Sequence, residues 1–150
     1  MIKSLIYNSD IKTILKKAET QSLTPDETSL LRQANWSELK VQQACKNSFR
    51  SRYYNRAKFI QTDNARSTKL QRMRAGIGGY EEGATDVYLV GKNKKIVFVE
   101  FKKIGSPSTV EPKPKQKEMH EFLRNCGFSS YYCNNIVYFE KVICKEFDEL

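Results

Sequence analysis

The sequence lacks any long apolar run. No stretch of its 150 residues approaches the roughly 18 consecutive apolar residues that a membrane-spanning helix needs. The apolar residues at the N-terminus are interrupted by Asn8 and Asp10, too early for a secretory signal. These absences predict a soluble protein of the cytoplasm that has no membrane partner.

Cysteine and histidine are few and dispersed. The only histidine is His120, and no Cys-x-x-Cys pair occurs among Cys45, Cys126, Cys133 and Cys144. This excludes a Cys/His zinc site and predicts reduced, partly buried thiols, with His120 as a packing or surface residue. Gly76, Gly78 and Gly79 lack the Gly-Lys-Ser/Thr ending of a phosphate-binding loop, so we expect no small-molecule cofactor.

Positive charge is concentrated in one part of the chain. Residues 46–74 hold nine basic residues and one acidic residue, Asp63, which gives this segment a net charge of +8 out of +9 for the whole chain. With Tyr53, Tyr54 and Phe59 among them, these charges suit a nucleic-acid backbone. The alternative is a solvated basic face. The candidate DNA-binding residues are Arg50, Arg52, Arg56, Lys58, Asn64, Arg66, Lys69, Arg72 and Arg74.

Periodicity and capping residues predict a mixed α/β chain. Residues 1–36 are expected to form a short helical extension and residues 37–150 the main domain. We expect loops at 63–66 and 105–109, and a helix from 113 or 114 to 125 with an inward stripe of Met119, Phe122, Leu123 and Cys126. The other expected helices cover about 9–17, 25–33, 37–51 and 136–150, and the strands 57–62, 85–90, 96–101 and 129–133. This order predicts a mixed sheet flanked by helices.

The segment TDVYLVGKNKKIVFVEFK, residues 85–102, predicts a hairpin with its turn centred near Asn93. Counting outward from the turn pairs Val90 with Ile96, and Tyr88 with Phe98. The same count places Asp86 opposite Glu100, on one face of the hairpin. The other face carries Val87, Leu89, Val97, Val99 and Phe101.

Two carboxylates placed opposite each other destabilise a sheet unless a positive group lies between them. Lys102 falls on the same face as Asp86 and Glu100 and could form an ordinary ion pair with them. Carboxylate oxygens are also the ligands that Mg²⁺ and Mn²⁺ prefer. A lysine beside such a metal suits the hydrolysis of a phosphodiester.

These residues resemble the PD-(D/E)xK nuclease superfamily, whose core is a hairpin with Asp on one strand and Glu-x-Lys on the next. More narrowly, the chain resembles the VRR-NUC branch over about residues 37–135. The matching pieces occur in the family's order as Glu38, the turn from Gly83 to Asp86, Glu100-Phe101-Lys102 and Gln116. Thr85 stands where the family has proline.

The resemblance implies a restriction-endonuclease-like fold and a role for each matched residue. Asp86, Glu100 and the Phe101 carbonyl would bind Mg²⁺ or Mn²⁺, and Glu38 would reach the same site from its helix. Lys102 would position the attacking water, and Gln116 would bond to the site or to the scissile phosphate. Glu38 and Gln116 can also be interpreted as ordinary polar residues in the first turns of helices.

The function that follows is a metal-dependent DNA endonuclease. Small members of the branch are typically phage-encoded or bacterial, and the resemblance implies a homodimer that favours branched DNA such as four-way junctions. One alternative is a nucleic-acid-binding module that has the same fold and does not cleave. Another is an RNA-associated basic protein whose carboxylates only pair with lysines.

Overall fold

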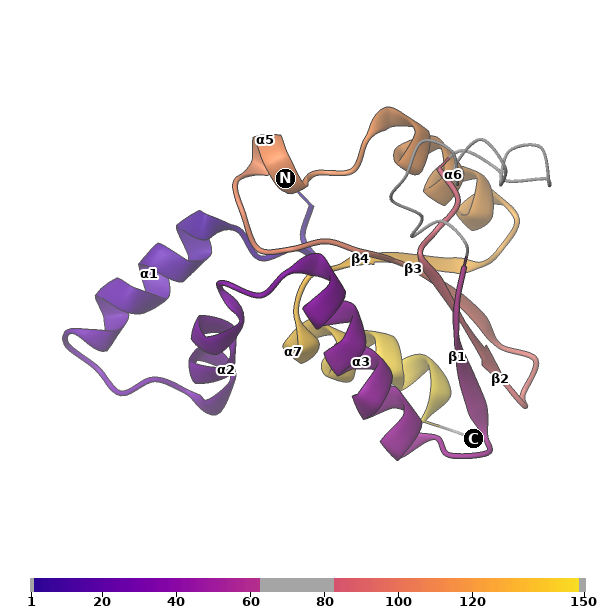
Figure 1. Ribbon diagram of the computed structural model, residues 1–150, viewed down its shortest axis with the longest axis horizontal. Coiled ribbons are helices and arrows are strands. Elements are labelled where there is room, and N and C mark those ends of the chain that lie inside the picture. The colour runs from indigo at the N-terminus through magenta and orange to yellow at the C-terminus, as the bar shows by residue number, and fades with distance from the viewer. Residues whose placement is uncertain (1, 63–82, 149–150) are drawn as a thin grey trace.

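The computed structural model describes residues 2–62 and 83–148 (Figure 1). These residues form a mixed α/β fold, which confirms the expected class. The main helices are α1 (Asn8–Ala18), α2 (Pro25–Gln33), α3 (Glu38–Arg52) and α6 (Pro114–Asn125). The strands are β1 (Ala57–Gln61), β2 (Val87–Gly91), β3 (Ile96–Phe101) and β4 (Ser129–Cys133). Shorter helical pieces are α5 (Pro107–Val110), α7 (Ile136–Tyr138), a π-helical turn (Phe139–Ile143) and a 3₁₀ turn (Cys144–Phe147).

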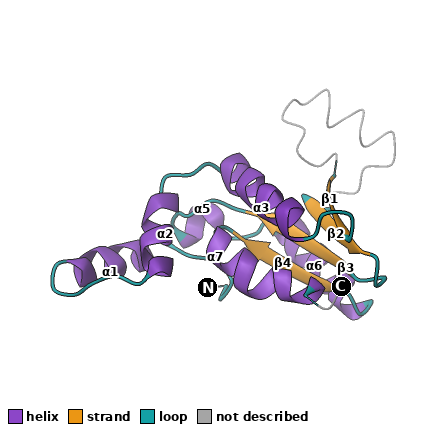
Figure 2. Ribbon diagram, turned by 90° about the horizontal axis from the view of Figure 1, so that it is seen from below, coloured by secondary structure: helices purple, strands orange, loops and turns teal. Residues whose placement is uncertain are grey.

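The four strands form one sheet in the order β1-β2-β3-β4 (Figure 2). β1 pairs antiparallel with β2, and β2 pairs antiparallel with β3. β4 pairs parallel with β3, because the chain crosses over through α6 between these two strands. The sheet therefore has a mixed topology, with helices on both faces.

The main core lies between one face of the sheet and the helices that cover this face. Figure 1 shows α3 together with α7 and the helical turns after it on this side, and α6 on the other. Val41, Cys45 and Phe49 recur every four residues along α3 and are buried. Phe49 packs against the rings of Tyr53, Phe59, Phe139 and Phe147.

The hairpin has the register expected from sequence. Val90 pairs with Ile96, and Tyr88 pairs with Phe98. At the turn, the Gly91 N–H donates to the Lys95 carbonyl at 2.9 Å, and Lys94 has a positive φ of 67°. The predicted core face is correct, since Val87, Leu89, Val97, Val99 and Phe101 are all fully buried.

The N-terminal helices pack against the main body. A salt bridge of 2.8 Å between Lys17 and Glu27 joins α1 to α2. Gln33, which is buried at the end of α2, accepts a hydrogen bond of 2.8 Å from the Ile136 N–H. The Asn8 N–H donates to the Gly105 carbonyl at 2.9 Å. The domain boundary at residue 36 remains a prediction.

Two local expectations are wrong. Residues Pro107–Val110 of the expected 105–109 loop form the helical turn α5, since Pro107 suits the first position of a helix. The apolar stripe expected for α6 points inward only in part: Met119 and Leu123 are half-buried, but Phe122 is 62% exposed and Cys126 is exposed, whereas His120 is buried. The reason is that the sheet face beneath α6 is polar at Ser130, with which His120 forms a hydrogen bond.

Within residues 2–62 and 83–148, no helix is both long enough and apolar enough to span a membrane. The predicted loop at 63–66 and the glycines Gly76, Gly78 and Gly79 lie outside the described residues. All four cysteines are free thiols, as expected. Cys126 is exposed, and the other three are buried.

Candidate active site

Asp86 and Glu100 meet at the open end of the hairpin, where the register places them opposite each other. Asp86 directly precedes β2, and Glu100 is the next to last residue of β3. The Asp86 N–H donates to Glu100 Oε2 at 3.1 Å, and the Phe101 N–H donates to Asp86 Oδ2 at 2.9 Å. Each carboxylate thus binds the backbone of the opposite strand, so the two acids form one unit.

This pair of acids is almost completely removed from water. Asp86 is 9% exposed and Glu100 is 2% exposed. Burial raises the pKa of Glu100 to about 9, and the neighbouring Asp86 adds to the increase. Burial also raises the pKa of Asp86, although the Phe101 N–H and the Lys102 charge oppose this shift. Both carboxyl groups are therefore poorly stabilised as anions unless a cation joins them.

Lys102 and Gln116 complete the polar surroundings of Glu100. Gln116 Nε2 donates to Glu100 Oε1 at 2.6 Å, and Lys102 Nζ donates to Gln116 Oε1 at 2.9 Å. The Lys113 N–H donates to the same Gln116 oxygen at 2.9 Å, which fixes the amide at the start of α6. The structure therefore brings together four of the residues expected from sequence: Asp86, Glu100, Lys102 and Gln116.

A close backbone contact sets the position of the α6 N-terminus relative to the acids. Gly83 has a φ of +85°, and a Cβ at this position would lie 2.4 Å from the Lys115 carbonyl oxygen. Only glycine allows both the left-handed conformation and this approach. The turn that leads to Asp86 is thereby packed against the helix that carries Gln116.

Glu38 begins α3 and approaches the same pair of acids. Its side chain keeps some surface exposure, yet desolvation of the carboxyl group raises its pKa, with the charge of Asp86 as the second cause. The charges of Lys102, Lys103 and Lys113 act in the opposite direction. Glu38 therefore lies in the electrostatic environment of Asp86, as expected from sequence.

The donor set suits a hard divalent cation held by few protein ligands. Within the described ranges, no group of three or more His, Cys, Asp or Glu side chains is arranged to hold a metal ion. Two carboxylates nevertheless match Mg²⁺, which typically takes one or two carboxylates and keeps several waters. Phe101 lies between Glu100 and Lys102 with its ring in the core, and its carbonyl as a ligand remains a prediction.

The predicted DNA-binding residues that the structure describes, Arg50, Arg52, Arg56 and Lys58, lie away from this site. Glu38 and Arg52 stand at opposite ends of the 15-residue helix α3, roughly 20 Å apart. Arg52 bonds to Glu140, and Lys58 pairs with Val90 near the hairpin turn. Asn64, Arg66, Lys69, Arg72 and Arg74 lie outside the described residues. The role of the whole set in DNA binding remains a prediction.

The sequence analysis missed a set of lysines beside the acids. Lys103 follows β3 directly, Lys113 is the N-cap of α6, and both are exposed. Their effect on the Glu38 pKa places both near the site. A pattern in the sequence could have predicted this set. Lysines flank both ends of the segment between β3 and α6, at Lys102, Lys103, Lys113, Lys115 and Lys117.

His120 also lies close to the site and is packed inside the fold. It is 1% exposed, and its ring stacks on Tyr132 with the centroids 3.9 Å apart. Burial lowers its pKa to about 4, and the charges of Arg124 and Lys102 act in the same direction. His120 is therefore neutral near pH 7.

Comparisons with known proteins add no assignment. The chain matches no family model, no curated protein and no solved structure.

Proposed function

We propose that this protein is a metal-dependent endonuclease that hydrolyses phosphodiester bonds in DNA, with a restriction-endonuclease-like fold of the VRR-NUC type. The observation that carries the proposal is the buried pair Asp86 and Glu100, each bonded to the backbone of the other's strand. A buried pair of acids whose pKa values are raised by burial is typical of a functional site.

The residues fit Mg²⁺ or Mn²⁺ through the oxygens of Asp86 and Glu100, with Glu38 close by. When bound, such an ion would supply Lewis-acid stabilisation of phosphate charge and would lower the pKa of a bound water, so that a base can deprotonate it more easily. Lys102 holds its ammonium group beside Glu100 through Gln116, where it can stabilise negative charge that develops on a phosphate. Gln116 orients both groups, because its amide donates to one and accepts from the other.

Selectivity for branched DNA and a homodimeric state belong to the same proposal. A four-way junction presents two equivalent strands, and two copies related by a two-fold axis would cut them in a paired manner. This part rests on the resemblance of the motifs in the sequence.

Incubation with supercoiled plasmid and with a four-way junction, in Mg²⁺, Mn²⁺ or EDTA, tests the proposal. We expect nicking in either metal and none in EDTA. Asp86→Asn and Glu100→Gln are expected to bind the same DNA without cutting it, since they keep the shape of the site. If wild-type protein shifts DNA and never nicks it in either metal, the protein is the non-cleaving binding module instead.

A further inference from the structure

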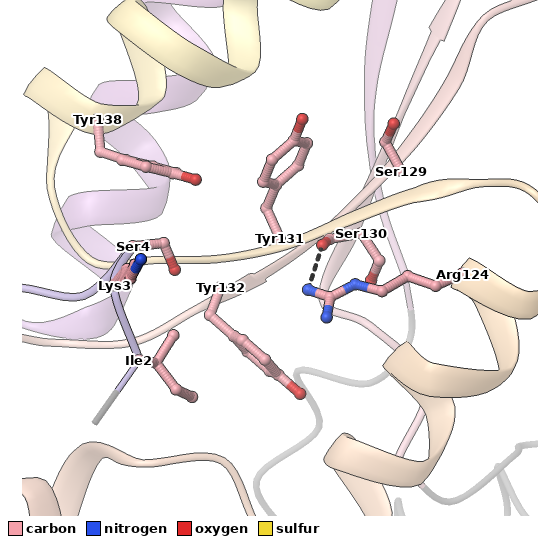
Figure 3. Close-up of a pocket in the computed structure, with 9 residues that line it drawn as sticks. All are labelled: Ile2, Lys3, Ser4, Arg124, Ser129, Ser130, Tyr131, Tyr132 and Tyr138. Atoms are coloured by element: carbon pink, nitrogen blue, oxygen red, sulfur yellow. Dashed lines mark hydrogen bonds between the residues drawn. The ribbon is translucent and has the colours of Figure 1, made fainter.

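A groove follows the outer edge of β4, the last strand of the sheet. Its volume is about 440 Å³, and its floor is formed by residues 129–132. Figure 3 shows Tyr138 and Tyr132 on either side of the strand, with Ile2 and Lys3 at one end and Arg124 at the other. The groove is thus formed by two parts of the chain that are distant in sequence, residues 2–4 and residues 124–138.

The lining of this groove combines cations, hydroxyls and aromatic rings. Lys3 and Arg124 contribute positive charge, and no carboxylate occurs among the described residues that line it. Serine and tyrosine hydroxyls supply further polar groups, and the half-buried Tyr138 offers an aromatic face, whereas Tyr132 is 6% exposed and stacks on His120. Positive charge beside aromatic rings is the combination that binds unpaired nucleotides.

A second cavity of about 420 Å³ adjoins the first, since Ile2, Arg124 and Tyr132 line both. It extends along α6 past Lys117 and Glu121. Together, Lys3, Lys117 and Arg124 outnumber the single carboxylate of Glu121. The combined groove is therefore complementary to a negatively charged ligand.

His120 provides independent evidence that a ligand belongs here. Its Nδ1 is bonded to the Ser130 hydroxyl, whereas Nε2 is buried and has no hydrogen-bond partner among the described residues. The residue lines the second cavity and is 1% exposed. A buried polar atom without a partner is rare in folded proteins and calls for a group that completes it.

The groove lies directly beside the candidate active site. Tyr132 pairs with Glu100 across β3 and β4, and adjacent strands are about 4.8 Å apart. The Tyr132 hydroxyl also bonds to the Gln116 carbonyl at 3.5 Å. Tyr132, which lines the groove, thus joins it to the strand and the helix that carry Glu100 and Gln116.

An added peptide strand fits this edge less well. A peptide that extends a sheet needs the outward backbone groups of the edge strand. Arg124 already donates to the Ser130 carbonyl at 3.0 Å and so occupies one of them. A guanidinium has five N–H donors, so this bond leaves donors for a phosphate.

We propose that the β4 groove binds an unpaired nucleic-acid strand, with a base against Tyr138 and phosphates against Lys3, Lys117 and Arg124. This inference rests on the proposed function, because it names the kind of strand that the same site receives: the single-stranded arm of a branched or flapped substrate. A cavity of this size holds a group as large as a nucleotide and excludes a base-paired helix.

Fluorescence anisotropy in EDTA tests binding separately from cleavage. The probes are labelled 12-nucleotide single strands of DNA and of RNA, and a blunt DNA duplex. Lys3→Gln combined with Lys117→Gln is expected to weaken single-strand binding roughly 10-fold and to reduce the salt slope by about 1.4, the value for two lost phosphate contacts. Lys12→Gln combined with Lys16→Gln removes the same charge from exposed positions of α1 and is expected to change binding less than about 2-fold.

A second set of variants tests base stacking. Tyr138→Leu is expected to weaken single-strand binding roughly 10-fold, whereas Tyr138→Phe keeps the ring and the affinity. Phe122→Leu, at an aromatic residue that is 62% exposed and lines neither cavity, is the matched control and is expected to bind like wild type. Ultraviolet cross-linking of a 5-iodouracil strand is expected to label the peptide that contains Tyr138.

Equal losses for the groove pair and the α1 pair would overturn the inference, as would tighter binding of a polyglutamate peptide than of either oligonucleotide. Single-strand binding in the groove by a protein that never nicks DNA would retain the binding site and reject the nuclease. If the protein nicks DNA and the groove variants bind single strands like wild type, the proposed nuclease is retained and the proposed groove site is rejected.

Discussion

The side-chain amide of Gln116 donates a hydrogen bond of 2.6 Å to Glu100, and its oxygen accepts one of 2.9 Å from Lys102. The amide can serve both partners only in one orientation, because its nitrogen donates and its oxygen accepts. Gln116 on α6 therefore links Glu100 and Lys102, which belong to β3 and the residue after it.

Replacing Gln116 with alanine should impair cleavage. Glu100 and Lys102 would lose their shared partner, and losses of this kind typically reduce metal affinity or activity 10- to 100-fold. Cleavage rates over a Mn²⁺ titration measure the effect. Gln43→Ala on the exposed side of α3 is the control, and equal activity of Gln116→Ala and wild type would assign Gln116 a structural role only.

Metal binding should stabilise the folded protein through the two acids. At a metal concentration 100 times its Kd, the gain is about 2.7 kcal/mol, or roughly 5–10 °C in Tm for a chain of this size. Glu100→Gln should abolish the increase. Glu118→Gln, at an exposed position of α6, should retain it. The comparison requires thermal melts in Mn²⁺ and in EDTA, and a wild-type Tm that does not respond to Mn²⁺ would contradict a metal site.

Two glycines with positive φ should differ in their response to alanine. At Gly127 a Cβ meets nothing within 4 Å, so the cost is the left-handed conformation alone, about 1 kcal/mol. At Gly83 the Cβ would collide with the Lys115 carbonyl, so Gly83→Ala should cost roughly 3 kcal/mol and should also displace Gln116. Urea denaturation gives the two free energies of unfolding. Similar values for both variants would mean that the Gly83 contact is loose.

Acid should destabilise the protein partly through His120. Its folded pKa of about 4 lies below the unfolded value near 6.5, so between these limits the unfolded chain binds a proton that the folded chain does not. This contribution to stability is complete above pH 6.5 and is lost as the pH falls towards 4, up to about 3 kcal/mol. His120→Gln should therefore show a shallower decline in Tm between pH 6.5 and 4. Parallel pH profiles for the two proteins would refute this.

The lysines beside the acids should contribute to duplex binding. Lys103→Gln with Lys113→Gln is expected to lower the magnitude of the salt slope by about 1.8, since each phosphate contact contributes about 0.9. The exposed pair Lys12 and Lys16 again serves as a control for loss of charge alone. Neutralising Arg50, Arg52 and Arg56 in parallel would show which end of α3 meets the duplex. If only the arginine variant loses affinity, the DNA lies at the far end.

Much of this arrangement could be predicted because it depends on local order. Counting from the turn of the hairpin places Asp86 opposite Glu100, and the helices α2 and α3 begin directly after Thr24 and Ser37, whose side chains cap them. The buried face of α6 could not be predicted in this way. An apolar stripe normally points inward, but here His120 is buried because it bonds to Ser130 and stacks on Tyr132. Both partners lie on β4, which follows the helix in sequence.

The lysines near the site escaped prediction for a similar reason. Charge density along the sequence favoured residues 46–74, whereas the positions of Lys103 and Lys113 depend on how the chain returns to the sheet between β3 and β4. Their proximity to Glu38 joins segments more than sixty residues apart. Linear charge counts carry no information about such pairs.

Asp86 and Glu100 each accept a hydrogen bond from the main chain of the opposite strand. The residues proposed for chemistry therefore also stabilise the open end of the hairpin. A newly made or partly opened chain whose hairpin is not closed to this point has no assembled pair of acids. Any ability to cut DNA would then require a hairpin that is closed as far as this pair of acids.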